Sequence, residues 1–124
     1  MIGDRDLQWL IDESQRYKLT CGWFLVIRAE WCDETPGRPR GLSYGLLLQD
    51  ENEHRILGFD NAHAFDGAKP DEPFDHEHKP GKEGQCFRYD FSSAGQLFKD
   101  FWARVAEFCG VKDVAFEIED DSDG

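Results

Sequence analysis

Basic residues are scarce in this chain of 124 residues, in which 14 Lys and Arg stand against 26 Asp and Glu, for a formal charge of −12 at pH 7. Proteins bind nucleic acid largely through Lys and Arg side chains that release counterions from phosphate. The charge of the whole chain therefore argues against tight, unaided binding of nucleic acid, and it favours a basic protein partner. A well-solvated surface with no partner would explain the same composition.

Long apolar stretches and an export signal are also missing. The longest apolar run, Trp23–Ile27, is far shorter than the ~20 residues of a membrane-spanning helix. No basic segment followed by an apolar one opens the chain, as it would in a secretory signal. We therefore expect a soluble, cytoplasmic protein with no membrane association.

The cysteines stand at spacings that match no metal-binding or redox motif. None of the four, Cys21, Cys32, Cys86 and Cys109, belongs to a C-x-x-C pair, which argues against a zinc knuckle and against a thioredoxin-type site. Because disulfides are rare in proteins that stay in the cytoplasm, we expect reduced and mostly buried thiols.

The hydrophobic pattern predicts a single α+β domain over residues 1–118 and an acidic tail over residues 119–124. Alternating apolar residues and short polar connections favour an antiparallel β-meander of four to five strands. Apolar residues at helical spacing predict an N-terminal helix and a long C-terminal helix packed on the sheet. The expected helices span residues 4–18 and 94–109, and the expected strands span residues 21–31, 42–49, 54–60, 86–91 and 114–118.

The C-terminal helix has signals at both of its ends. Ser93 and Gln96 form an S-x-x-Q capping box at its start, and Gly110 follows its last turn, where glycine often ends a helix. Its apolar residues fall on one stripe, so we expect the rings of Phe101 and Trp102 to be largely buried. The stripe consists of Leu97, Phe98, Phe101, Trp102, Val105, Phe108 and Cys109.

Residues 62–84 have no hydrophobic period and are rich in Pro, Gly, His and acidic residues. A loop of this length in a compact domain is usually functional or disordered. It holds three of the four histidines, His63, His76 and His78. Since exposed loop residues have few packing contacts, we expect replacement of His76 or His78 by Ala to change the free energy of unfolding by at most ~0.5 kcal/mol.

His76 and His78 are the residues best placed to do chemistry. Their spacing of two puts both imidazoles on one side of an extended segment, and Asp60 and Asn61 would lie within reach if the loop folds back. Such a group could hold a divalent metal between imidazole and carboxylate ligands. It could also pair one His as general base with the other as general acid, as a metal-free ribonuclease does on the ribose 2′-hydroxyl.

The metal-free version is favoured because no third ligand stands at a spacing that singles it out, and the cofactor stays unknown. Arg28, Arg88 or Lys79 could stabilise negative charge on a phosphate. Two simpler explanations also fit the pattern. One is an exposed His/Asp loop that binds nothing, and the other is a role for Asp60 and Asn61 in capping a turn through their side chains.

The order of these elements resembles the TumE family of small bacterial toxin–antitoxin proteins over residues 22–109. In that family a β-meander leads into a hydrophobic-aromatic-Asp-Asn sequence, an Asp-His-x-His element, a Tyr/Phe strand and a closing Leu-x-x-Asp-Phe helix. The corresponding segments here are Leu57-Gly58-Phe59-Asp60-Asn61, Asp75-His76-Glu77-His78, Phe87-Arg88-Tyr89-Asp90-Phe91 and Leu97-Phe98-Lys99-Asp100-Phe101.

The resemblance implies a toxin whose antitoxin partner carries a helix-turn-helix DNA-binding domain. A ribonuclease acting on RNA would fit the histidines, and its catalytic residues would be His76, His78, Asp60, Asn61 and Arg88. The competing hypothesis is a non-enzymatic module whose acidic surface binds a basic partner protein. A basic patch near His76 would favour the enzyme, and one continuous acidic face would favour the module. Whether the protein forms a homodimer stays open.

Overall fold

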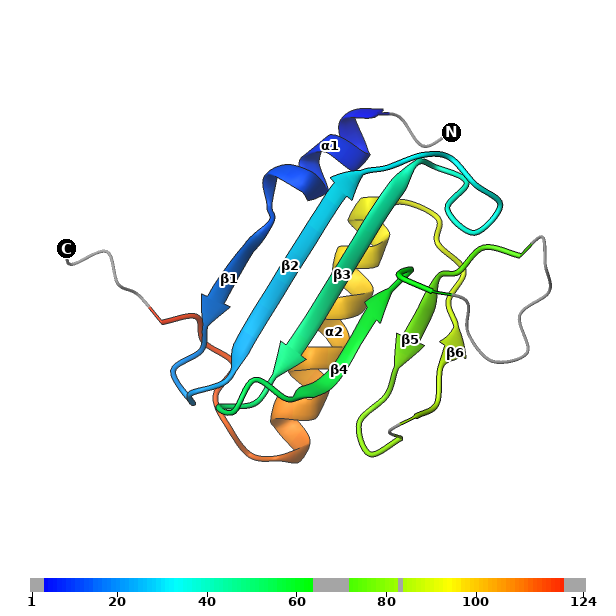
Figure 1. The fold of residues 1–124 in the computed structure, drawn as a ribbon. Coiled ribbons are helices and arrows are strands. Elements are labelled where there is room, and N and C mark those ends of the chain that lie inside the picture. Colours follow the sequence, from blue (N-terminus) through cyan, green and yellow to red (C-terminus); the bar gives the residue numbers. More distant parts are fainter. Residues whose placement is uncertain (1–3, 64–71, 83, 120–124) are drawn as a thin grey trace.

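The computed structural model describes residues 4–63, 72–82 and 84–119, which form a six-stranded antiparallel sheet with both helices on one face (Figure 1). The strands follow one another in space as they do along the chain. Neither helix of this described part is long and apolar enough to span a membrane. The helices are α1 (Asp4–Asp12) and α2 (Ala94–Val111), and the strands are β1 (Gln15–Lys18), β2 (Phe24–Trp31), β3 (Leu42–Gln49), β4 (Arg55–Asp60), β5 (His76–His78) and β6 (Phe87–Arg88).

The α+β meander expected from the sequence is confirmed, with six strands in place of four to five. The helix expected over residues 4–18 is too long, because α1 ends at Asp12 and the chain then pairs along β2 as β1. Ser14 fixes this change of direction, since its Oγ accepts a hydrogen bond from the Ala29 N–H at 2.9 Å. A contact distant in sequence thus overrides the local helical pattern.

Two further segments differ from the expectation. The second added strand, β5, lies within the stretch expected to be a loop. The last expected strand, residues 114–118, is reduced to an isolated bridge between Leu19 and Ile118. Of the acidic tail, only Glu119 belongs to the described residues, and its N–H donates to the Lys18 carbonyl at 2.7 Å.

The core lies between α2, α1 and the inward-facing residues of β2, β3 and β4. The alternation expected in the first long strand is confirmed for Leu25, Ile27 and Ala29, whereas Trp31 at the strand end is 46% exposed. Burial of this apolar surface is the main favourable contribution to folding. The buried hydrophobic residues are Leu7, Leu10, Leu19, Leu25, Ile27, Ala29, Leu42, Tyr44, Leu46, Leu48, Leu57, Phe59, Ala94, Leu97, Phe101, Val105 and Cys109.

The start of α2 is as expected, but its end is not. Ser93 Oγ accepts a hydrogen bond from the Gln96 N–H at 3.0 Å, as an N-cap should. The helix continues through Gly110 to Val111, so the expected glycine stop is wrong. Asp113, at φ 55°, takes the left-handed conformation that ends the segment.

The two rings expected to be buried on α2 differ in their surroundings. Phe101 is fully buried, whereas Trp102 is 38% exposed, so the expectation is wrong for Trp102. Trp102 lies at the border of the apolar stripe, with ring centroids 5.5 Å from Phe98 and 4.6 Å from Phe116. The Trp102 ring thus packs against Phe116 of the C-terminal segment and not against the sheet.

Candidate functional site

The pairing of β4 with β5 brings the candidate residues together. Asp60 lies opposite His76, and Gly58 lies opposite His78, so the side chains of Asp60, His76 and His78 point to one face of the sheet. The intervening Glu77 points to the other face, where its carboxylate pairs with Arg104 of α2 at 2.9 Å. The two imidazoles and Asp60 therefore lie on the face that α2 does not cover.

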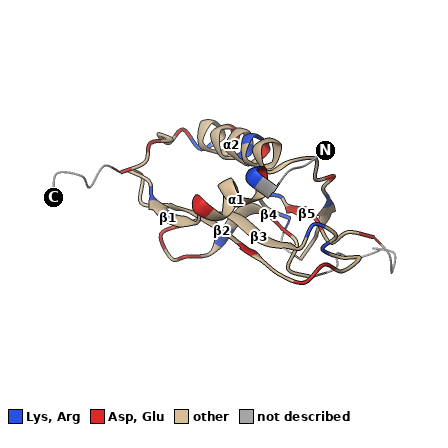
Figure 2. Ribbon diagram, turned by 90° about the horizontal axis from the view of Figure 1, so that it is seen from above, with Lys and Arg blue, Asp and Glu red and all other residues tan. Residues whose placement is uncertain are grey.

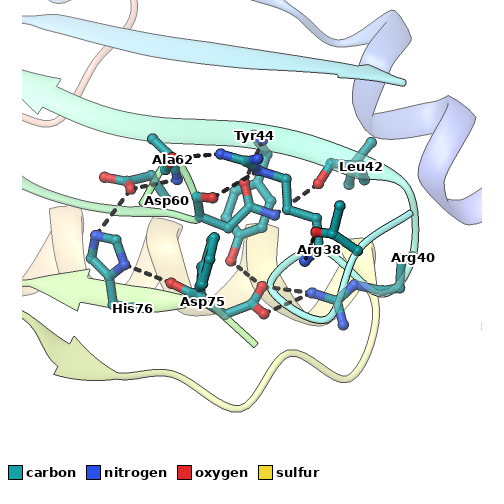
Figure 3. A network of polar contacts seen from close by, with 11 residues as sticks. Arg38, Arg40, Leu42, Tyr44, Asp60, Ala62, Asp75 and His76 are labelled. Carbon is teal, nitrogen blue, oxygen red and sulfur yellow. Dashed lines mark hydrogen bonds and ion pairs between the residues drawn. The ribbon is translucent and has the colours of Figure 1, made fainter. Parts of the chain in front are cut away.

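We call Asp60, His76 and His78 the Asp–His cluster. Asp60 Oδ1 lies 3.0 Å from His76 Nε2, and Asp60 Oδ2 lies 3.0 Å from His78 Nε2 (Figure 3 shows His76 and Asp60). The two Nε2 atoms are also 3.0 Å apart. The expectation that both imidazoles lie on one side, within reach of Asp60, is confirmed. Their exposure was expected and is wrong, because His76 is 0% and His78 is 7% exposed.

This burial follows from strand formation in the expected loop. The Phe74 N–H donates to the Gly37 carbonyl at 2.8 Å, just before β5, and β5 then pairs with β4 on one side and β6 on the other. Because β5 is a central strand, the side chains of its neighbours flank its own side chains on both sides and cover them. A polar His-Glu-His sequence gives no local sign of this.

The electrostatics of the Asp–His cluster follow from its burial and its hydrogen bonds. Burial by itself would raise the pKa of Asp60, but hydrogen bonds from His76 and His78 hold this pKa well below its usual range. Burial would lower the pKa of His76, but Asp60 and the Phe74 carbonyl together raise it. The His76 Nδ1–H donates to that carbonyl at 2.7 Å (Figure 3), which fixes the orientation of the ring.

Two more residues that could take part in chemistry, His63 and Cys86, lie next to the Asp–His cluster. The ring centroid of His63 is 5.1 Å from that of His76. Potential ligand atoms of His76, His78 and Cys86 lie within 4.8 Å of one another, as do those of Asp60, His63 and His76. Cys86 was expected to be an ordinary buried thiol, and its spacing to the histidines gave no signal of this proximity.

Arg28 of β2 reaches toward Asp60 across a glycine of β3. A Cβ atom added to Gly45 would lie 3.0 Å from Arg28 Nη2 and 3.9 Å from Asp60 Cβ. Gly45 thus leaves the space through which the exposed guanidinium approaches the cluster. Arg28 makes no ion pair or hydrogen bond with another described side chain, so its charge is available to a ligand on this face.

Arg88 and Asn61 take other roles in the described part of the chain. Arg88 is exposed and its guanidinium forms an ion pair with Glu72. Asn61 is fully buried, and its side chain donates to the Leu42 carbonyl at 2.7 Å and accepts from the Tyr44 N–H at 3.0 Å. Both ends of the Asn61 amide are therefore used to extend the β3–β4 pairing and not to cap a turn. The local contact of the turn-capping kind is made by Asp60, whose Oδ1 accepts from the Ala62 N–H at 3.1 Å.

A second buried network, around Asp75, holds the start of β5 (Figure 3). Asp75 is 2% exposed and accepts hydrogen bonds from Arg40 Nη2, at 2.7 and 2.8 Å, and from the Tyr44 hydroxyl, at 2.7 Å. Burial and the Asp75 carboxylate raise the pKa of Tyr44 well above its usual value, so its hydroxyl stays protonated as a donor. The network holds the backbone directly before His76.

A groove of about 940 Å³ borders His78. It lies among the second half of α2, the start of β4 and the turn after β5. Basic side chains outnumber acidic ones in its lining by five to three, although the whole chain has a charge of −12. The basic residues are Arg55, Lys79, Lys82, Arg104 and Lys112, the acidic residues are Asp50, Glu77 and Glu107, and the histidines are His54 and His78.

Acidic residues elsewhere are spread over helices and loops and do not gather on one element of the described chain (Figure 2). The basic residues of the groove lie beside His78 and not around His76. In the described residues, neither of the two charge patterns that would separate an enzyme from an interaction module is therefore met as expected. Comparison with known proteins gives one result: the family model of Toxin TumE matches residues 11–108. No curated protein and no solved structure matches the chain.

Proposed function

Since the chain belongs to the TumE family of toxins, we propose that it is the toxin of a bacterial toxin–antitoxin system and that it cleaves RNA at the Asp–His cluster. The family assignment supports the toxin role and implies an antitoxin partner. The choice of RNA rests on one observation. One member of the Asp–His cluster, His78, whose Nε2 lies 3.0 Å from Asp60, also lines the groove in which basic residues predominate, on the side of the sheet that α2 covers.

RNA cleavage needs few groups, and this site offers the required types. The ribose 2′-hydroxyl loses its proton to a base, its oxygen bonds to phosphorus, the bond from phosphorus to the 5′-oxygen breaks, and that oxygen takes up a proton. His78 and Asp60 are each 7% exposed and are the cluster members nearest to solvent. Arg28, on the same face, would stabilise charge on the phosphate.

The groove would hold the RNA backbone. Lys79 and Lys82 are exposed in the turn after β5, and the groove is also lined by Arg104 of α2 and by Lys112, which follows the last residue of α2. Phosphate neutralisation by a few such side chains gives weak, salt-dependent binding. This local binding is compatible with an acidic protein because charges beyond the screening length of ~10 Å at 0.1 M salt contribute little.

The decisive test is RNA cleavage by the purified protein and its variants. His78→Ala should reduce cleavage by about 10²–10⁴-fold, the usual contribution of a proton-transferring side chain. His54→Ala is the matched control, because His54 lines the same groove but its side chain is 80% exposed and outside the cluster. It should lose much less activity. Thermal melts of both variants establish that they remain folded.

Charge reversal provides a second arm that leaves the cluster intact. Lys82→Glu should weaken RNA binding and reduce its salt dependence, whereas Lys99→Glu, an exposed change on α2 outside the groove, should have little effect. If the wild-type protein inhibits growth but cleaves no RNA, and the His78→Ala protein is still fully toxic, the RNA proposal is wrong. A non-enzymatic interaction module then becomes the better explanation.

We also propose that the antitoxin partner carries a helix-turn-helix domain and presents a basic face to this acidic chain. The support is the charge of −12 together with the family assignment. The affinity of the complex should fall as salt rises, since exposed charges are screened beyond ~10 Å at 0.1 M. Titration of the co-purified partner at several salt concentrations measures this. An affinity independent of salt would show that apolar contacts dominate the complex.

A further inference from the structure

The three contacts of the Asp–His cluster cannot all be satisfied by protons. His76 Nδ1–H donates to the Phe74 carbonyl, so only the two Nε2 atoms can supply hydrogens for the contacts among His76, His78 and Asp60. If both Nε2 atoms carry hydrogen, each bonds Asp60, but the 3.0 Å contact between them sets donor against donor. If one gives up its hydrogen, its lone pair faces the Asp60 carboxylate at 3.0 Å.

A metal cation satisfies the same three contacts at once. Ligand atoms bound at about 2.0–2.1 Å to one ion lie roughly 2.8–3.0 Å from one another in octahedral geometry and roughly 3.3–3.4 Å from one another in tetrahedral geometry. The two Nε2 atoms are 3.0 Å apart, and each is 3.0 Å from a different oxygen of the Asp60 carboxylate. Two imidazoles and a carboxylate are also a donor set that first-row divalent metals accept.

The surroundings of His76 provide an independent indication. A metal-ligating histidine almost always donates its other ring N–H to a carbonyl or carboxylate, which fixes the tautomer and aims the free lone pair at the metal. His76 Nδ1 has this contact with the Phe74 carbonyl at 2.7 Å. With Nδ1 in this hydrogen bond, the ligand atom of His76 is Nε2, which faces Asp60 and His78.

We infer that the Asp–His cluster binds one divalent ion of the zinc class through His76 Nε2, His78 Nε2 and an Asp60 carboxylate oxygen, with Cys86 Sγ as the fourth ligand. The Cys86 sulfur lies within 4.8 Å of a ligand atom of each histidine. A thiolate beside imidazoles selects zinc over magnesium or calcium. The inference rests on the same residues as the proposed RNA cleavage. While the ion is bound, His78 Nε2 acts as a ligand and not as a proton-transferring group, so the metal-bound and the catalytic forms of the cluster are distinct states.

Metal content of the full-length protein tests the inference without reference to activity. Protein treated with a chelator and then equilibrated with ZnCl₂ should retain about one zinc per chain after gel filtration. Its melting temperature should rise with zinc concentration, because an ion that binds the folded chain stabilises it. Zinc content well below one per chain, with no shift in melting temperature, would overturn the inference.

Cobalt substitution tests the ligands. Co²⁺-loaded protein should show visible d–d bands and a thiolate-to-cobalt charge-transfer band. Cys86→Ser should remove the charge-transfer band and weaken binding by about tenfold or more. Cys32→Ser is the matched control, since Cys32 is also half-buried but bonds the Asp33 carbonyl, and its spectrum should be unchanged. A charge-transfer band that survives Cys86→Ser would overturn the assignment of Cys86.

Asp60→Asn examines the three-ligand core with a side chain of the same shape. It should abolish stoichiometric zinc binding, and retained binding would contradict the core assignment. The metal site and the RNA activity can fail separately. Stoichiometric zinc in a protein that cleaves no RNA leaves the metal site intact and removes the proposed function. RNA cleavage at full rate in metal-free protein that also fails to take up zinc leaves the proposed function intact and removes the metal site.

Discussion

His76→Ala is expected to lower the free energy of unfolding by about 3–5 kcal/mol in chelator-treated protein. His76 is fully buried, so its loss creates a cavity. It also leaves the Phe74 carbonyl without its donor and removes one of the two imidazoles that compensate the buried Asp60 carboxylate. Chemical denaturation, with an unchanged slope as a check on two-state behaviour, measures this difference.

The matched control for His76→Ala is His54→Ala. The His54 side chain is 80% exposed and its Nδ1 lies 3.6 Å from an Asp50 carboxylate oxygen, so its loss should change stability by no more than about 0.5 kcal/mol. If His76→Ala is as mild as His54→Ala, the segment is an exposed loop and the described cluster is wrong. If the effect is large, a loss of toxicity in a His76 variant can come from unfolding, so each such variant needs its own thermal melt. A Cys86 variant whose melt is unchanged is easier to interpret.

The parts of the fold that could be predicted are those whose signal is local. The alternating residues of β3 set its bounds at Leu42–Gln49, as expected, and Ser93 marks the start of α2. β1 and β5 could not be predicted, because their sequences, Gln15–Lys18 and His76–His78, show no apolar alternation. Each is a strand because a neighbouring strand supplies its hydrogen-bond partners, and a short polar sequence gives no sign of that pairing.

The candidate site divides in the same way. The i, i+2 spacing of His76 and His78 was enough to place them on one side, and their meeting with Asp60 followed from a loop that folds back. Cys86 required knowledge of the turn between β5 and β6, and the approach of Arg28 over Gly45 required the register of β2 and β3. Sequence spacing gives neither, since both depend on which residues the sheet sets opposite each other.

The basic tip of the loop before β3 shows how a charged segment can be misleading in isolation. Arg38 donates from Nε to the Asn61 carbonyl at 3.0 Å, and Arg40 binds the buried Asp75. Both guanidinium groups are therefore used inside the molecule, where they connect this loop to the ends of β4 and β5. Near the cluster, the basic residues of the described chain that form no ion pair are Arg28, Arg55, Lys79, Lys82 and Lys112, since Arg104 is paired with Glu77.

The Asp75–Arg40 pair gives the second large stability effect. Asp75→Ala should lower the free energy of unfolding by about 3–5 kcal/mol, because removing one partner of a buried pair leaves an uncompensated charge. The Arg40 side chain is only 17% exposed, and its Nε already has no hydrogen-bond partner among the described residues. Lys18→Ala is the control: its pair with Glu119 is half-exposed at 3.9 Å and should contribute less than about 1 kcal/mol.

A double variant distinguishes charge from packing as the cause. In Asp75→Ala with Arg40→Met, no buried charge is left unpaired, and the apolar Met keeps contact with Phe91, over whose ring the Arg40 guanidinium lies at 3.9 Å. The double variant should therefore be more stable than Asp75→Ala alone, since replacing both members of a buried pair is often close to neutral. Equal or greater destabilisation in the double variant would mean that Asp75 acts through its hydrogen bond to Tyr44 and not through Arg40.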